Sequence, residues 1–207
     1  MVTLGLGPII GTRWLAPRLG DFWQRHPNID LRLHHTAFPM QHSAEIFDLA
    51  IAWGNGNWAG LTSRLFISIE MTPVISPELV RPQTPADLTR YPLIHERDRL
   101  GWQQWFRESD LDDQHAQSGP IIDDANLVIQ TVLSGQGIAL GILPFVAEDL
   151  DSGRLIQPFE QTIRPENAYY LIHQPNNLHK PAIQVVYDWL LAQINQDAPS
   201  GNISSIK

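Results

Sequence analysis

Residues 3–15 read TLGLGPIIGTRWL and join a strand-like alternation to a helix-like run. Apolar residues alternate as far as Gly7, as in a β-strand, and Leu15 and Leu19 begin an apolar pattern with helical spacing. The two patterns are separated by glycines, at positions Gly5, Gly7 and Gly11. A strand that turns into a helix is the unit from which layered α/β folds are built. The stretch therefore predicts an α/β fold, and its glycine-rich turn is the first candidate for a binding loop.

The glycines do not have the spacing of a dinucleotide-binding turn. Such a turn requires G-x-G-x-x-G and, about 20 residues further on, an acidic residue at the end of the next strand. Here Pro8 lies inside G-x-G-x-x-x-G, and the next predicted strand ends in His34 and His35. A second run, SGQGIALG at 134–141, follows a helix and enters a strand, which is the reverse order. Two interpretations stay open: an ordinary turn, or a turn whose backbone N–H groups hold a carboxylate or another anion.

Strand and helix patterns continue to alternate along the chain, as expected for an α/β fold with a largely parallel sheet. Thr12 is the expected N-cap of the first helix, and Pro27 is its expected stop. A change in composition near Met71 predicts a lobe boundary. Strands are predicted at 2–7, 29–35, 48–53, 67–79, 93–95, 119–123, 137–143 and 169–175, and helices at 12–27, 102–109, 126–135 and 181–194.

Composition excludes several classes of function. The 207 residues carry a net charge of -8, whereas a nucleic-acid interface needs clustered Lys and Arg. No cysteine is present, so there is no disulfide framework, thiolate nucleophile or Cys-ligated zinc. No apolar run reaches the roughly 18 residues of a membrane span, and the N-terminus lacks the pattern of a secretory signal. The chain is expected to be cytoplasmic and to have no membrane partner.

Catalytic and metal-binding motifs are missing as well. His34 and His35 are neighbours on a predicted strand, so they point to opposite faces and do not converge on one metal ion. No nucleophile is paired with a base, and we expect no enzyme activity, no metal and no cofactor. The acidic clusters at 112–113 and 148–151 are expected on solvated faces or at helix ends. Asp124 precedes the helix that begins near Asn126, and helix capping and ligand contact are both open for it.

Seven segments, in this order, resemble the effector-binding domain of LysR-type transcriptional regulators. The likeness is greatest to the subgroup that includes glycine-cleavage and β-lactamase regulators, and it extends from Val2 to Ile194. No single motif carries it; the order of many segments does. The segments are TRWLAPRLGDFWQRHPNIDLRL (12–33), FDLAIAWGNGNWAGL (47–61), RLFISIEMTPVISPEL (64–79), TPADLTRYPLIH (84–95), WQQWF (102–106), DDANLVIQTVLSGQGIALGILPFVAEDLDSGRLIQPF (123–159) and YYLIHQP (169–175).

The resemblance implies an α/β, periplasmic-binding-protein-like fold in which two Rossmann-like lobes are joined by two crossover strands. Lobe I would comprise residues 1–70 plus 166–207, and lobe II residues 71–165. The family's DNA-binding helix-turn-helix is absent from this chain, which is expected to be either a trimmed regulatory domain or a naturally partial protein. Contact with promoter DNA would then go only through that missing domain.

The implied function is that of a ligand-sensing and dimerising regulatory domain, with a small-molecule effector in the cleft between the lobes. A homodimer or a higher homo-oligomer is expected. The alternative is a solute-binding protein of a transport system, which has the same lobes and would need a secretory signal. By matching position, the effector-binding residues implied by the resemblance are Ile10, Gly11, Thr12, Phe38, Trp53, Asp124 and Asn126.

The first turn departs from the family pattern. Many members carry Ser or Thr hydroxyls there, whereas this chain has Pro8, Ile9 and Ile10, and only Thr12 brings a hydroxyl. We therefore expect an effector with an apolar part, such as a carboxylate-bearing metabolite, because a bare anion would be poorly compensated against apolar side chains. For Trp53, a place in the core and a place in the site both stay open.

Overall fold

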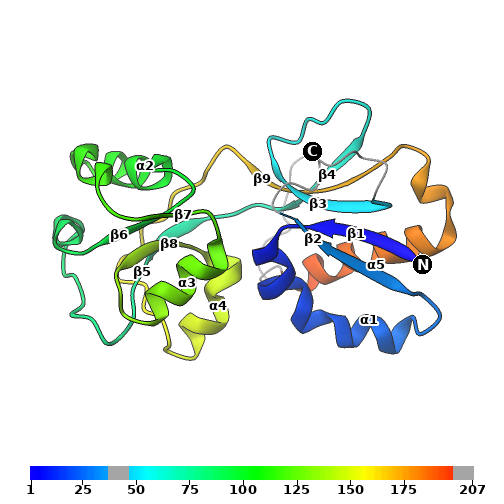
Figure 1. The fold of residues 1–207 in the computed structure, drawn as a ribbon, viewed down its shortest axis with the longest axis horizontal. Coiled ribbons are helices and arrows are strands. Elements are labelled where there is room, and N and C mark those ends of the chain that lie inside the picture. The colour runs from blue at the N-terminus through cyan, green and yellow to red at the C-terminus, as the bar shows by residue number, and fades with distance from the viewer. Residues whose placement is uncertain (37–46, 198–207) are drawn as a thin grey trace, which may run out of the picture. The chain divides into compact units, whose positions relative to one another are not determined.

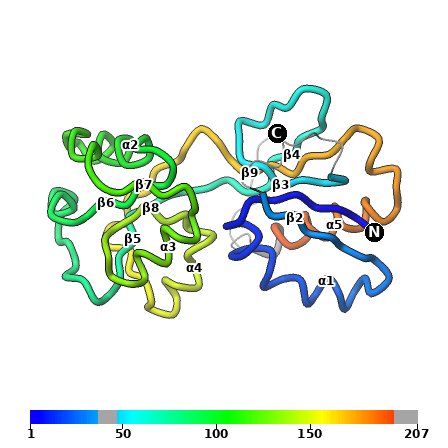
Figure 2. Tube along the Cα trace, in the orientation of Figure 1, coloured from blue at the N-terminus to red at the C-terminus, as the bar shows by residue number. Residues whose placement is uncertain are grey.

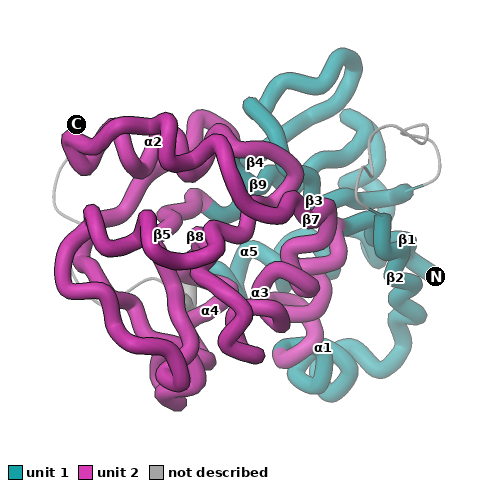
Figure 3. Tube along the Cα trace, turned by 60° about the vertical axis from the view of Figure 1, so that its left-hand side comes forward, with its two compact units in different colours: residues 1–6, 18–67, 168–207 teal, residues 7–17, 68–167 magenta. Residues whose placement is uncertain are grey.

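The computed structural model describes residues 1–36 and 47–197, and the chain divides into two compact units (Figure 3). The first unit consists of residues 1–6, 18–67 and 168–207. The second consists of residues 7–17 and 68–167. The segment 7–17, which directly follows the first strand, is thus grouped with the second unit. Each unit has a β-sheet and helices of its own (Figure 1).

The first unit is built on a five-stranded sheet with the order β2-β1-β3-β9-β4. Strand β1 pairs in parallel with β2 and β3, and β9 pairs antiparallel with both β3 and β4. The sheet is therefore mixed, and a late strand of the chain lies between two early ones. The strands are β1 (Val2–Leu6), β2 (Leu31–His35), β3 (Leu49–Gly54), β4 (Thr62–Ile67) and β9 (Ala168–His173).

Two helices, α1 (Leu19–Arg25) and α5 (Pro181–Asp197), complete the first unit. The indole N–H of Trp189 donates to the Asp21 carboxylate over 2.9 Å, and its ring lies 4.9 Å from that of Phe22. This hydrogen bond is the main reason why the pKa of Asp21 lies below its usual value. A short 3₁₀ helix at Asn177–His179 leads into α5.

The second unit is built on a four-stranded sheet with the order β5-β8-β6-β7. Strand β8 pairs antiparallel with β5 and parallel with β6, which in turn pairs in parallel with β7. The three parallel strands end at the same edge of the sheet, where α/β folds place their ligands. The strands are β5 (Met71–Val74), β6 (Leu93–Glu96), β7 (Ile121–Ile122) and β8 (Ile138–Ile142).

Side chains of this sheet alternate between two hydrophobic cores. Leu93 belongs to the core of α2 (Leu100–Glu108), whereas Ile94 belongs to the core of α3 (Ala125–Leu133). Helix α4 (Leu143–Asp151) adds Val146 to the α3 core. Successive residues of a strand point to opposite faces, so β6 and β8 contribute to both cores. Short 3₁₀ helices lie at Pro85–Arg90 and Asp113–Gln117.

Most predicted elements are present, but the stretch around residue 67 differs from its prediction. The sequence predicts one extended segment over 67–79, whereas the structure has two separate strands, β4 ending at Ile67 and β5 at Met71–Val74. The beginning of β4 is missed because Arg64 and Leu65 are both exposed, which breaks the alternation. Within residues 1–36 and 47–197, no helix is long and apolar enough to cross a membrane.

Candidate functional site

The turn after β1 is a one-turn π-helix, Ile10–Leu15, which continues through a 3₁₀ segment at Ala16–Arg18 into α1 (Figure 2). The N–H of Ala16 donates to the carbonyl of Gly11, five residues earlier. Pro17 has no N–H and so cannot continue an α-helical ladder, which explains the change of helical type. Single π-helical turns are rare and occur frequently at functional sites.

Thr12 does not cap this helix, so that prediction is wrong. Helical geometry begins earlier: Ile9 is the capping residue and already has helical φ and ψ angles of -67° and -45°. Pro8, which precedes it, has its φ fixed close to the helical value by its ring. Thr12 lies inside the turn, where its exposed side chain donates a hydrogen bond to the Pro8 carbonyl over 2.9 Å. The hydroxyl is therefore accessible and free of a capping role.

Ile10 and Gly11 are buried, unlike Thr12. The N–H of Gly11 donates to the carbonyl of Gly7 over 3.1 Å. These two residues therefore support the turn from within, and Thr12 is the member of the predicted trio that presents a polar group to solvent.

Asp124 caps α3, as the sequence allowed. Its carboxylate accepts a hydrogen bond from the N–H of Leu127 over 3.0 Å, and the residue itself is exposed. Asn126 lies in the first turn of the same helix and is half-buried; its Oδ1 atom is buried and accepts no hydrogen bond from the described residues. Both residues follow β7, so they lie at the carboxyl edge of the second unit's sheet.

Glu96 lies at the end of β6, at the same edge of the sheet as Asp124 and Asn126. The sequence interpretation does not include it among the site residues. Its side chain is 32% exposed. Burial is the main cause that raises the pKa of Glu96, and the charges of Asp124 and Asp98 raise it further, while Arg97 opposes them. The segment HERDR at 95–99 contains the only available signal, because its charged residues directly follow an apolar strand.

His95, one residue earlier, supports this edge from inside. It is 1% exposed, and its Nε2 lies 2.8 Å from the carbonyl oxygen of Ser118, which can only accept, so Nε2 carries the proton. Burial lowers the pKa of His95, and Arg99 lowers it further. The buried imidazole thus connects β6 to the segment before β7 through its hydrogen bond to Ser118. No group of three metal-binding side chains occurs in the described parts of the chain.

Two predicted site residues belong to the first unit. Trp53 lies near the end of β3, half-buried, and its ring centroid is 5.1 Å from that of Tyr169 on the adjacent strand β9. Tyr169, which the sequence pattern does not indicate, is an aromatic neighbour of Trp53. Core and site roles stay open for Trp53. Phe38 lies outside the described residues.

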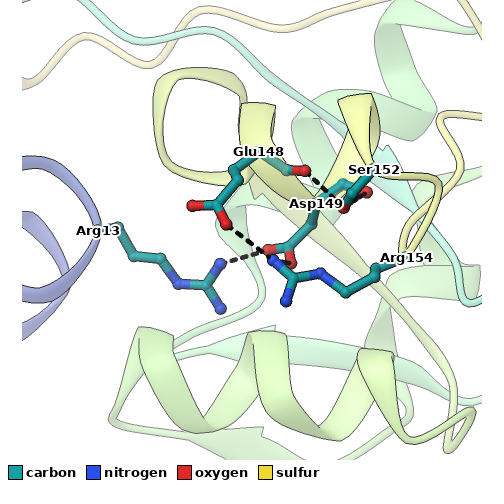
Figure 4. A network of polar contacts seen from close by, with 5 residues as sticks. All are labelled: Arg13, Glu148, Asp149, Ser152 and Arg154. Atoms are coloured by element: carbon teal, nitrogen blue, oxygen red, sulfur yellow. Dashed lines mark hydrogen bonds and ion pairs between the residues drawn. The ribbon is translucent and has the colours of Figure 1, made fainter. Parts of the chain in front are cut away.

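The acidic cluster at 148–151 lies in the last turn of α4, one of the two places expected for it, on a solvated face or at a helix end. Glu148 is 85% exposed, but Asp149 is only 1% exposed, and the sequence does not predict its burial. Its carboxylate forms ion pairs with Arg13 of the first turn and with Arg154 (Figure 4). A buried carboxylate with two arginine partners therefore lies next to the turn that carries Thr12, and one of these arginines belongs to that turn.

Comparison with known proteins identifies the family. Residues 1–195 match the family described as LysR substrate binding domain. The chain belongs to this family. The LysR domain is 32% identical over 196 residues to the glycine cleavage system transcriptional activator of Escherichia coli strain K12, covering 93% of this chain and 64% of the relative. It is 30% identical over 179 residues to the transcriptional activator AmpR of Citrobacter koseri, covering 86% of this chain and 62% of the relative.

Solved structures agree with this assignment. The effector domain of AmpR from Pseudomonas aeruginosa matches with a TM-score of 0.84 and 28% identity, covering 95% of this chain and 96% of that one. The AmpR effector-binding domain from Citrobacter freundii matches with a TM-score of 0.85 and 25% identity, covering 94% and 98%. The LysR domain thus has the periplasmic-binding-protein-like α/β fold of these regulators, and it spans less than two thirds of the length of the curated relatives it matches.

Proposed function

We propose that this LysR domain is the effector-sensing, dimerising part of a transcriptional regulator. The observation that carries the proposal is the family match over residues 1–195. The relatives that are similar over most of this chain are transcriptional activators. These relatives favour regulation over the transport alternative. We propose binding without catalysis, a cytoplasmic location, and promoter contact through a separate DNA-binding domain.

The proposed effector site uses the exposed hydroxyl of Thr12 and the polar groups that follow β6 and β7. Thr12 would donate to or accept from an effector carboxylate or hydroxyl. The carboxylates of Asp124 and Glu96, together with the unpaired Oδ1 of Asn126, are acceptors and favour an ammonium or hydroxyl donor. The apolar turn around Ile10 suits a hydrocarbon part. These features support a zwitterionic or hydroxylated carboxylate as effector.

The test is a thermal-stabilisation panel in which three ligands share one hydrocarbon part. L-leucine carries both charged ends, 4-methylpentanoate only the carboxylate and 3-methylbutylamine only the ammonium group; glycine and L-serine vary the apolar part. Bound at about 100 times its dissociation constant, an effector adds roughly 2.7 kcal/mol to the stability of the native state. We expect zwitterions to stabilise most. Equal stabilisation by the amine alone would contradict the proposed carboxylate anchor.

The proposed dimer uses exposed apolar side chains on two helices. Trp23 on α1 is 58% exposed, and Leu127 on α3 is 55% exposed. Exposed aromatic residues are enriched at protein interfaces. We propose that α1 of one copy packs against α3 of a second copy in an antiparallel, side-by-side dimer. Two-fold symmetry would then repeat the α1–α3 contact, so it would occur twice in the interface.

A further inference from the structure

Asp149 occupies a position that is unfavourable for a carboxylate. It lies in the last turn of α4, where the helix dipole disfavours negative charge, and its side chain is only 1% exposed. A buried charge is tolerated when it is paired and hydrogen-bonded. The two arginine partners are therefore a requirement of this position and not an incidental surface contact.

The two partners are not equivalent. Asp149 Oδ1 lies 2.8 Å from Nη2 of Arg154, and Oδ2 accepts from Nη1 of Arg13. The Arg154 side chain is 55% exposed, whereas that of Arg13 is 16% exposed. Figure 4 shows the two guanidinium groups reaching the same carboxylate from opposite elements, the first turn and the segment after α4. Arg13 is the enclosed partner, so its ion pair is less screened by water.

The end of α4 holds the backbone of Asp149 on its own. The hydroxyl of Ser152 donates to the carbonyl of Glu148 over 2.7 Å, and the N–H of Leu155 donates to the carbonyl of Asp149 over 2.9 Å. Gly153 adopts a left-handed conformation, φ +71°, which turns the chain so that Arg154 returns to the helix end. Asp149 is thus held in place before Arg13 is considered.

The first turn, in contrast, is held by the burial of Ile10, Trp14 and Leu15 and has no polar cap. Its π-helix has no side-chain hydrogen bond at the N-cap, and π-helical geometry is uncommon. Helix α4 packs against this turn. Residues 7–17 group with the second unit although the chain on both sides of them belongs to the first. The enclosed ion pair of Arg13 is a charged contact that binds the turn to α4.

We propose that Asp149 is a positioning residue of the effector site: through Arg13 it holds the turn that presents Thr12. The inference rests on the proposed function for the role of the turn, but the placement of the turn can be tested without any effector. Asp149 itself does not touch the effector in this proposal. Its carboxylate holds the guanidinium of Arg13, and this ion pair holds the backbone that carries the hydroxyl of Thr12.

The test is hydrogen–deuterium exchange of the whole unliganded chain, read in peptides that cover residues 8–17. Arg13→Gln and Asp149→Asn should each accelerate exchange there by roughly tenfold or more, because a hydrogen bond between charged groups is lost. Arg154→Gln is the matched control, since it removes a partner of the same carboxylate that does not touch the turn. Arg13→Lys should protect the turn better than Arg13→Gln. Peptides from α2 and α5 should exchange as in the wild type.

Two results would overturn the proposal. One is acceleration throughout the chain in Arg13→Gln, which would assign the pair to general stability. The other is a turn that exchanges equally fast in Arg154→Gln and Arg13→Gln. Since no ligand is present, either result leaves the proposed effector function to be judged by the thermal-stabilisation panel alone.

Discussion

The hydroxyl of Thr12 donates to the backbone carbonyl of Pro8 over 2.9 Å, at an exposed position of a turn whose other residues are mostly buried. An exposed hydrogen bond of this kind exchanges readily with water, so it contributes little to stability. The same hydroxyl is available to an effector that replaces the carbonyl as its partner.

Thr12→Val should therefore lower the free energy of unfolding by less than about 1 kcal/mol, a change of roughly 2–4 °C in Tm or smaller. The apparent affinity for the most stabilising zwitterion of the panel, measured by thermal stabilisation, should fall by at least tenfold. Thr89→Val is the matched control, because Thr89 makes the same type of bond to the Ala86 carbonyl over 2.8 Å. Equal ligand affinity in both variants would remove Thr12 from the site.

Asp124 allows its capping role and its charge to be separated. Asp124→Ala should cost about 1 kcal/mol of stability, because the N–H of Leu127 loses its cap. Asp124→Asn keeps a capping oxygen and should be nearly neutral in denaturant unfolding. If the charge recognises an ammonium group, Asp124→Asn weakens binding of L-leucine and leaves 4-methylpentanoate unaffected.

The same Asp124→Asn variant should change the titration of Glu96. The Asp124 charge raises the pKa of Glu96, so its removal should move that pKa down toward its ordinary value. Carboxyl ¹³C shifts measured across a pH series would show the change. An unaltered Glu96 titration would mean that the two carboxylates do not interact.

His95 should make the domain less stable in mild acid. Burial lowers its pKa in the folded chain, so the unfolded chain binds more protons as the pH falls below 6.5. The contribution to stability is present above pH 6.5 and is lost as the pH falls through the folded-state pKa. His95→Gln, whose amide can still donate to Ser118, should flatten this slope in urea unfolding at pH 5 to 7.5. A slope equal to that of the wild type would assign the acid sensitivity to other groups.

The proposed dimer predicts that Trp23→Ser weakens self-association by roughly tenfold or more, because interface tryptophans commonly contribute above about 1 kcal/mol. Leu127→Ser should act in the same direction. Leu100, which is 64% exposed on α2, provides the control Leu100→Ser. Analytical ultracentrifugation over a concentration series measures the effect, and a wild-type chain that stays monomeric throughout would contradict the proposed interface.

The sequence predicts the fold well wherever burial produces a clear period. Strand β1 and helix α3 lie where the apolar patterns place them, because their buried residues recur at two and at three to four positions. The beginning of strand β4 is missed because Leu65 is 50% exposed on an edge strand. The sequence pattern at the beginning of β4 therefore does not show which side chains are buried.

The candidate site is less predictable than the fold. Asp124 is recognisable as a cap from its place before a helix, but Thr12 has the same local signature and is not one, because Pro8 starts the helical geometry earlier. The burial of Asp149 depends on Arg13, which is 136 residues away in the chain. No local pattern indicates such a pair, so the sequence predicts a helix end for this carboxylate but not its burial.

Strand β9 lies between β3 and β4 in the first unit's sheet and pairs with both. During synthesis on the ribosome, the residues between Ile67 and Ala168 are therefore made before the strand partner of β4 begins to emerge. The second unit, residues 7–17 and 68–167, is complete in sequence by residue 167, so its two cores can form first. The order of translation thus favours assembly of the inserted unit before the one that contains the N-terminus.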